Sequence, residues 1–227
     1  MFEYLMPLLV MPDYEHTLLD HTSRGAVQQQ IAYGRLHGVP WGISESGYNR
    51  TDVHLTYQYR AFGVPGLGVK RGLGQDLVIA PYATAMALMV DPEAACDNLQ
   101  RLAAEGRAGR YGFYEAVDYT PTRVPPDEAS ATVFSYMAHH QGISLLSLAN
   151  ALHGNPMQRR FMACPLLRAG QLLLQERVPR RSPTIDPRPL DEMRVAAPIA
   201  AVPVRSYRSA HTVYPHTQFL SNGNYVT

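Results

Sequence analysis

Three acidic side chains stand in aromatic stretches of the sequence, where they could carry acid–base chemistry. Glu3 lies in the segment FEYLMP, Glu45 in WGISESGYN and Glu115 in YGFYEAVDY. Aromatic and apolar neighbours desolvate a carboxyl group and favour its protonated form, which suits a general acid. Two such groups on either side of a sugar can cleave or transfer a glycoside. The residues leave open which two would do so, and Glu3 also fits an ordinary acid on the wet face of a helix.

Aromatic, hydroxyl and amide side chains gather in the same stretches and could bind a sugar. Ligand sites combine aromatic walls with a few polar groups that fix orientation. The candidate substrate-binding residues are Trp41, Ser44, Tyr48, Tyr57, Tyr59, Tyr114, His139, His140 and Gln141. A structural loop around a buried tryptophan explains the segment near residue 41 equally well.

Other chemistries have little support in the sequence. His139 and His140 are adjacent, so on a helix they point about 100° apart and do not chelate as a pair four residues apart would. The glycine-rich segment 63–74 contains Lys70, but Arg71 follows it instead of Ser or Thr, so it is not a phosphate loop. The pattern Gly-x-Ser-x-Gly of serine hydrolases does not occur. We therefore expect no metal site and no cofactor.

The composition is that of a folded chain. Of 227 residues, 46% are hydrophobic and 17% charged, and the net charge is +1. A disordered chain would be poorer in apolar residues, and a nucleic-acid-binding protein normally shows a basic stripe. No secretory signal opens the chain, and its apolar stretches are too short to span a membrane. Cys96 and Cys164 are expected to be buried free thiols.

Helices joined by long loops must position these residues. Apolar spacing predicts helices over 16–37, 77–90, 91–106, 135–152 and 157–177, the last bent near Pro165. Asp91, Pro92 and Glu93 form a good helix start. The segments 39–74 and 107–126 are expected to be loops, with a short strand at 56–60. Long irregular loops in a helical body point to a site.

The two ends of the sequence are core-like. The chain opens on apolar residues without a helix cap, and after a proline-rich stretch it closes on strand-like sequence behind an Asn-Gly turn. We interpret the chain as a piece of a longer polypeptide.

Several motifs resemble the glucoamylase-like domain of bacterial cyclic β-1,2-glucan synthases. They are MFEYLMP at residue 1, PWGISES at residue 40, YGFYEA at residue 111 and MAHHQG at residue 137, followed by the domain-exit motif LQERVP at residue 174. PHTQFLSNG at residue 215 is similar to the opening of the phosphorylase-type region of these enzymes, which is related to cellobiose phosphorylases. The resemblance implies a mainly α chain: a partial (α/α)6-toroid at 1–178, a Pro-rich linker at 179–203, and the first strands of a β-supersandwich at 204–227.

The resemblance also implies a function and partners. In these enzymes one region extends a β-1,2-glucan from UDP-glucose, the glucoamylase-like region cyclises it by transglycosylation, and the phosphorylase-type region controls its length. Glu3 would be the acid/base, its partner acid would lie upstream of residue 1, and Glu45 and Glu115 would serve substrate binding or the local proton network. The chain alone would then be inactive.

The expected partners are β-1,2-glucan or a related oligosaccharide and the remaining domains of the synthase, with neither nucleic acid nor membrane contact by this segment. The parent would lie in the bacterial inner membrane, with this segment soluble on the cytoplasmic side. Two alternatives stay open. One is a non-catalytic carbohydrate-binding module that uses Trp41, Tyr48, Tyr57 and Tyr59, and the other is a stand-alone endo-β-1,2-glucanase.

Overall fold

The computed structural model of the chain describes residues 1–68, 70–177 and 211. The chain divides into two units after Arg180, and all described residues except His211 belong to the first. The linker expected at 179–203 and the strand segment expected at 204–227, apart from residue 211, lie outside the described residues.

The described part is mainly helical, as expected. Its α-helices are α1 (Phe2–Leu5), α2 (Leu18–His37), α3 (Pro81–Ala87), α4 (Pro92–Ala104), α5 (Ala138–His153), α6 (Pro156–Met162) and α7 (Pro165–Ala169). Three 3₁₀ helices accompany them: η1 (Met6–Leu9), η2 (Leu73–Gln75) and η3 (Gln171–Gln175). Among these residues no helix has the length and apolar character needed to cross a membrane.

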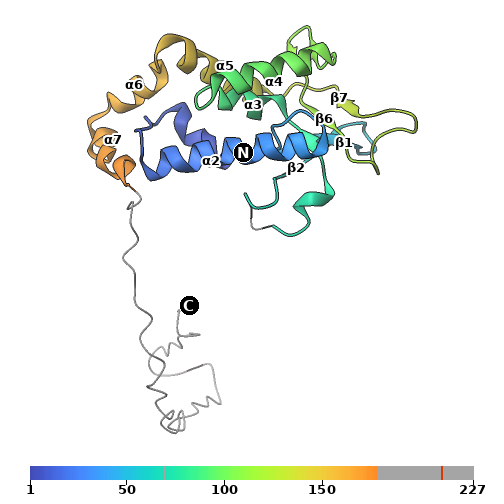
Figure 1. The fold of residues 1–227 in the computed structure, drawn as a ribbon, viewed down its shortest axis with the longest axis horizontal. Helices are drawn as coiled ribbons and strands as arrows, with labels where there is room; N and C mark the ends of the chain where they lie inside the picture. The colour runs from blue at the N-terminus through green and yellow to red at the C-terminus, as the bar shows by residue number, and fades with distance from the viewer. Residues whose placement is uncertain (69, 178–210, 212–227) are drawn as a thin grey trace. The chain divides into compact units, whose positions relative to one another are not determined.

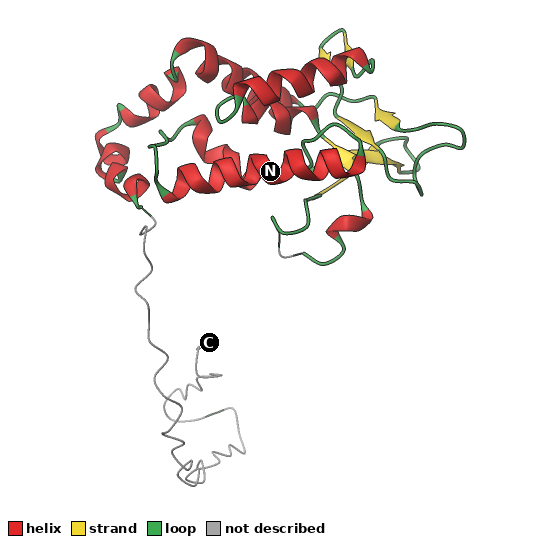
Figure 2. Cartoon of the chain, in the orientation of Figure 1, coloured by secondary structure: helices red, strands yellow, loops and turns green. Residues whose placement is uncertain are grey.

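Three small antiparallel sheets gather at one end of this unit (Figure 1). β1 (Ser46–Thr51) pairs with β2 (Tyr57–Arg60), and β4 (Ala108–Gly109) pairs with β5 (Gly112–Phe113). The third sheet has the order β3 (Val78–Ile79), β6 (Ala116–Asp118), β7 (Ala131–Val133). Figure 2 shows the strands at one end of the unit and the short helices after α5 at the other.

The two longest capped helices begin where local chemistry favours them. The Asp91 carboxylate accepts the Ala94 N–H at 3.1 Å, and Pro92 occupies the first position of α4. Thr17 caps α2 in the same way through the Asp20 N–H. α2 ends at Gly38, whose φ of 70° is the left-handed conformation that glycine adopts without strain.

Two apolar cores hold the elements together. α3 packs between α4 and α5, and its residues are buried along its whole length. The first core joins α1, α2, α3 and α4 around Leu5, Val27 and Met86, each at most 1% exposed. The second lies at the sheets, around Ile79, Val117 and Leu102. The site described below lies where these two cores meet, because the loop between α2 and β1 contributes Trp41 to the first and Ile43 to the second.

Several expected elements differ from those observed. The helix expected over 77–90 starts as strand β3, and Pro81 opens α3 instead of lying inside it. The expected loop 107–126 contains β4, β5 and β6, which are too short to show a periodic pattern. The expected helix 157–177 is divided into α6, α7 and η3, with Pro165 opening the second segment.

The expectation of buried thiols was wrong. Cys96 and Cys164 are both free but exposed. Cys96 lies on α4 away from its buried residues, and Cys164 precedes the short α7, which has no buried residue.

Candidate active site

The loop that carries Glu45 is held from behind by two buried amide side chains. The Gln30 amide on α2 bonds both the N–H and the carbonyl of Ile43, each at 2.8 Å. The Asn98 amide on α4 does the same for Trp41, at 3.1 and 2.8 Å. Buried backbone groups need such partners, because an unpaired one costs about 1–3 kcal/mol. These hydrogen bonds fix the backbone of the loop at Trp41 and Ile43. Glu45, two residues further along the same loop, is half-buried.

A hydrogen bond brings the segment of Glu3 to this loop. The Phe2 N–H donates to the Ser44 hydroxyl oxygen at 3.1 Å. Glu3 and Glu45 consequently border one pocket of about 220 Å³, with Tyr4 and Phe62 among its walls. Glu3 itself is exposed. Glu3 and Glu45, which are 42 positions apart in the sequence, thus place their carboxylates at the same pocket.

The Met1 α-amino group interacts electrostatically with the carboxylates of both Glu3 and Glu45. Burial lowers the pKa of this amine to about 6, and the charges of Glu3 and Glu45 act in the opposite direction. Both side chains therefore lie close enough to the same amine to interact with it electrostatically.

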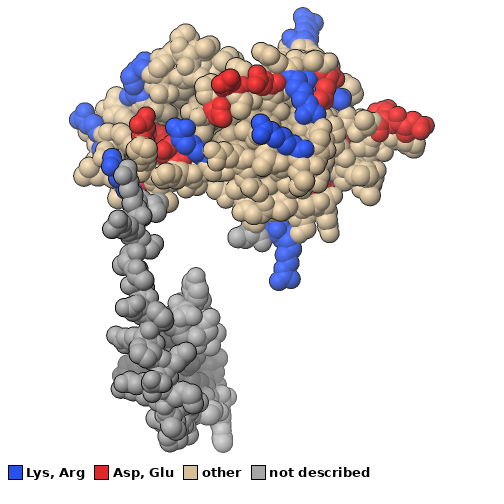
Figure 3. Space-filling model, in the orientation of Figure 1, with Lys and Arg blue, Asp and Glu red and all other residues tan. Residues whose placement is uncertain are grey.

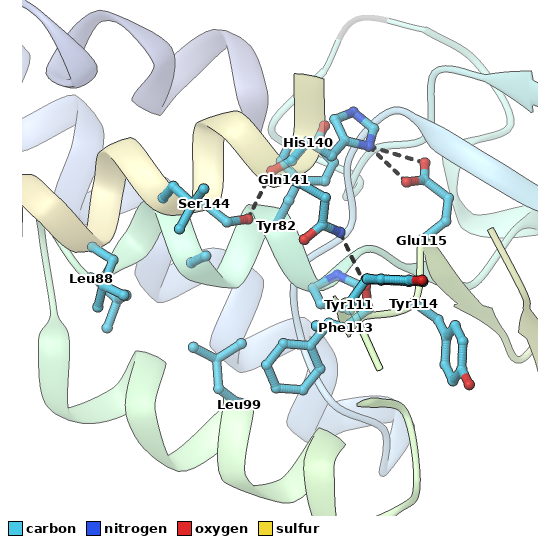
Figure 4. A pocket seen from close by; sticks show the side chains of 15 residues that line it. Tyr82, Leu88, Leu99, Tyr111, Phe113, Tyr114, Glu115, His140, Gln141 and Ser144 are labelled. Carbon is cyan, nitrogen blue, oxygen red and sulfur yellow. Dashed lines mark hydrogen bonds and ion pairs between the residues drawn. The ribbon is translucent and has the colours of Figure 1, made fainter. Parts of the chain in front are cut away.

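Glu115 differs from Glu3 and Glu45 in its burial and its partners. It is 2% exposed, and its carboxylate lies 2.9 and 3.0 Å from Nδ1 of His140, which is equally buried (Figure 4). The Gly47 N–H donates to the same carboxylate at 3.0 Å. The third candidate acid is thus fully engaged with β1 and α5.

Two tyrosines flank the His140 ring. Tyr82 of α3 stacks on it, with ring centroids 3.7 Å apart and planes 10° apart, and the Tyr59 hydroxyl lies 3.3 Å from Nε2. The Tyr82 hydroxyl lies 2.9 Å from both the Ser44 hydroxyl and the Glu45 carbonyl oxygen. Burial raises the pKa of both tyrosine hydroxyls, and for Tyr59 the charges of Glu45 and Glu115 and a hydrogen bond with Glu45 raise it further.

An ion-pair network supports β1 from the other side. Arg123 pairs with the fully buried Asp118 at 2.6 Å and with Asp76 at 2.5 Å. These carboxylates raise the pKa of Arg123 despite its burial, which acts to lower it. The guanidinium also lies 5.0 Å from the centre of the Tyr48 ring. Tyr48, a residue of β1, therefore packs against this ion-pair network.

The remaining predicted binding residues do not lie together in one place. Trp41 is 7% exposed in the first core, which favours its structural interpretation, and Tyr57 packs against the second core. Tyr59 is 40% exposed, and the exposed His139 lies edge-on to it, with centroids 6.3 Å apart.

Tyr114 and Gln141 line a second pocket of about 390 Å³ (Figure 4). The Gln141 amide donates to the Phe113 carbonyl at 3.1 Å, and Tyr114 packs on Phe134 and Tyr136. Glu115 and His140 also line this second pocket and do not line the one that Glu3 and Glu45 border.

Sequence reasoning missed three residues that build the site: Tyr82, Gln30 and Asn98. Each is a polar side chain on the buried face of a helix, at most 5% exposed. Such a residue needs a hydrogen-bond partner, so its position in a buried helix was the available signal.

Charge and metal-ligand patterns add no second chemistry in the described residues. These contain no group of three or more His, Cys, Asp or Glu side chains that could hold a metal ion. On the face seen in Figure 3, arginine and lysine side chains are scattered without forming a stripe.

Comparisons with known proteins assign the chain to a family. A family model described as "Putative glucoamylase" (Glycoamylase) matches residues 1–165. The chain is 45% identical over 234 residues to the cyclic β-(1,2)-glucan synthase NdvB of Rhizobium meliloti (strain 1021), covering 99% of this chain and 8% of that protein. It therefore spans about a twelfth of that relative's length.

Two solved structures are similar as well. A putative glucoamylase from Bacteroides caccae ATCC 43185 superposes with a TM-score of 0.52 at 21% identity, over 77% of this chain and 40% of the other. An endo-β-1,2-glucanase from Chitinophaga pinensis has a TM-score of 0.47 at 23% identity, over 69% of this chain and 35% of the other. The first likeness shows a shared fold. With the family match over 165 of 227 residues, the chain belongs to the Glycoamylase family and is homologous to a segment of a cyclic β-1,2-glucan synthase.

Proposed function

We propose that this chain is part of the transglycosylating domain of a cyclic β-1,2-glucan synthase, with Glu3 as its acid/base. The observation that supports the proposal is the shared pocket, which the exposed Glu3 and the half-buried Glu45 both border. The homology to the Rhizobium meliloti enzyme supports the substrate. The remaining domains of the synthase and its place in the bacterial inner membrane, with this segment on the cytoplasmic side, belong to the same proposal.

The reaction would join the free hydroxyl end of a glucan chain to a sugar further along the same chain, breaking the glycosidic bond at that sugar and releasing the part of the chain beyond it. Glu3 gives its proton to the oxygen of the glycosidic bond that breaks, and its carboxylate later takes the proton of the sugar hydroxyl that attacks. The linear and cyclic glucans carry the same β linkage, so configuration is retained. Retention needs a second carboxyl group about 5–5.5 Å from the first. The family resemblance puts that group upstream of residue 1 and leaves Glu45 to bind substrate or move a proton.

A chimaeric enzyme tests this function. In it, the chain replaces the aligned segment of the Rhizobium meliloti synthase, and products from UDP-glucose are separated into linear and cyclic glucans. We expect cyclic glucan, with linear glucan as the control that the chimaera is folded and able to extend chains. Linear glucan without any cyclic product would contradict the proposal.

The isolated chain provides the second arm of this test. We expect it to leave linear β-1,2-glucan uncleaved, because it holds only one of the two carboxyl groups that the reaction needs. The measurement is the release of reducing ends over time. Cleavage by the isolated chain would show that Glu3 and Glu45 suffice as the pair.

A further inference from the structure

The short helix α1, which carries Glu3, has no side-chain cap at its start. The first N–H groups of a helix have no partner inside it and need one elsewhere. The Phe2 N–H finds this partner in the Ser44 hydroxyl oxygen, 3.1 Å away. On the other side of Glu3, the Tyr4 hydroxyl donates to the Leu67 carbonyl oxygen at 2.7 Å. Both sequence neighbours of Glu3 are thus held by hydrogen bonds from distant segments.

Ser44 can hold α1 in place because its own position is fixed. It is 1% exposed, and it follows Ile43, whose backbone is bonded by the Gln30 amide. The Tyr82 hydroxyl lies 2.9 Å from the Ser44 hydroxyl oxygen and 2.9 Å from the carbonyl oxygen of Glu45, the next residue. The sequence suggested Ser44 as a substrate-binding residue, but these bonds engage its hydroxyl inside the protein.

Counting hydrogens shows that these groups can form one continuous chain. The Phe2 N–H only donates, and the Glu45 carbonyl only accepts. Ser44 and Tyr82 each have one hydroxyl hydrogen, which rotates to suit its partner. When Ser44 donates to the Tyr82 oxygen and Tyr82 donates to the Glu45 carbonyl, all three bonds are made and no hydrogen is used twice. The chain then joins the backbone beside Glu3 to the backbone of Glu45.

The ring of Tyr82 is fixed by the buried Glu115–His140 pair. It stacks on the imidazole, with ring centroids 3.7 Å apart and planes 10° apart. Nδ1 of His140 lies 2.9 and 3.0 Å from the Glu115 carboxylate oxygens, and both residues are 2% exposed. A ring packed this closely cannot turn without displacing its neighbours. The pair, which has no part in the reaction proposed above, therefore helps to aim the Tyr82 hydroxyl.

We propose that Ser44 and Tyr82 form a hydroxyl bridge that sets the position of Glu3 relative to Glu45 at the pocket which both acids border. The proposal rests on the function proposed above, in which Glu3 is the acid/base. A general acid must lie within about 2.6–3.2 Å of the oxygen that it protonates, so a small displacement slows the chemical step. Ser44 and Tyr82 are then positioning residues that act through Glu3.

Two variants each remove one hydroxyl of the bridge and keep the rest of the side chain: Ser44→Ala and Tyr82→Phe. Ser147→Ala is the matched control for the first, because Ser147 is equally buried and donates to a carbonyl of its own helix, α5, at 2.9 Å. Tyr119→Phe is the control for the second. The Tyr119 hydroxyl donates to Glu105 at 2.8 Å, and neither of these two residues lines the pocket.

The first measurement needs no activity. In the chain labelled with ¹⁵N-phenylalanine, hydrogen exchange of the Phe2 amide reports on its bond to Ser44, and Phe2→Leu assigns the signal. Ser44→Ala should speed this exchange by at least about 5-fold, because the N–H loses its acceptor. Ser147→Ala should leave it unchanged, and the other phenylalanine amides show whether each variant is folded. An unchanged Phe2 rate in folded Ser44→Ala would overturn the proposal.

The second measurement is ring formation by the chimaera from linear β-1,2-glucan. A buried group left without its partner corresponds to about a 5-fold to 100-fold effect. We expect Ser44→Ala and Tyr82→Phe each to lower kcat by this amount with little change in KM. Ser147→Ala and Tyr119→Phe should leave both constants unchanged, and losses of kcat in these controls as large as in the bridge variants would overturn the proposal.

The double variant of Ser44→Ala and Tyr82→Phe tests whether the two residues act as one unit. Because either change breaks the same bridge, the double variant should lose no more kcat than the more damaging single variant. A loss equal to the product of the two single losses would overturn the proposal. The exchange measurement is independent of turnover, so failure of the glucan assignment and failure of the hydroxyl bridge give different results.

Discussion

The three candidate acids differ in their partners, although their sequence surroundings are alike. Glu3 is exposed at the pocket, Glu45 is half-buried beside Tyr59, and Glu115 is 2% exposed against His140. The hydrogen-bond partners that distinguish Glu115 come from positions 25 and 68 residues away. Aromatic composition could locate the stretches that carry them, but their ranking depends on long-range contacts that no local pattern contains.

In the isolated chain that begins at Met1, the α-amino group of this residue gives a pH prediction at the same scale. Its pKa is about 6 in the folded chain and 8.0 when unperturbed, so between these values the unfolded chain binds more protons. The free energy of unfolding should therefore rise as the pH rises from 6 to 8, by at most about 2–3 kcal/mol. Urea unfolding at several pH values measures it. An N-acetylated chain should lack this contribution, and identical slopes for the two chains would contradict the prediction.

At the scale of elements, local signals predicted helices with a side-chain cap better than short strands. Asp91, Pro92 and Glu93 start α4 as expected, and the strand expected at 56–60 is β2. β3 and β6 have two and three residues, so pairing with distant segments, and no periodicity of their own, defines them. Burial on α2 does not follow hydrophobicity, because Gln30 and Ser23 are buried while Leu36 is 78% exposed.

A buried leucine on α4 and an exposed leucine on α5 give a prediction about stability. Leu102 of α4 is fully buried in the second core, whereas Leu145 of α5 is 67% exposed in the described part. Leu102→Ala should lower the free energy of unfolding by about 2–5 kcal/mol, since it removes buried contacts and leaves a cavity. Leu145→Ala is the matched control and should change it by less than about 0.5 kcal/mol. Denaturant unfolding compares them, and equal effects would show that the two sites are packed alike.

At the scale of the whole molecule, the chain spans 8% of the cyclic β-(1,2)-glucan synthase that it matches and 40% of the similar glucoamylase. Its net charge of +1 fits the neutral glucan that we propose as its substrate, because a neutral sugar is bound by aromatic faces and hydrogen bonds rather than by charge. The motifs could predict the family, because FEYLMP, PWGISES and MAHHQG lie within the 165 residues that the family model matches. The toroid and the downstream domain stay predictions.

The acid/base role of Glu3 is tested most directly by the ratio of cyclic to linear glucan formed by the chimaera with Glu3→Gln. The exposed Glu128→Gln serves as the matched control. Glutamine keeps the shape of the side chain but cannot donate or take the proton, so we expect cyclic glucan to fall by at least about 100-fold while linear glucan is still made. Glu128→Gln should keep the original ratio. An unchanged ratio in Glu3→Gln would contradict the account.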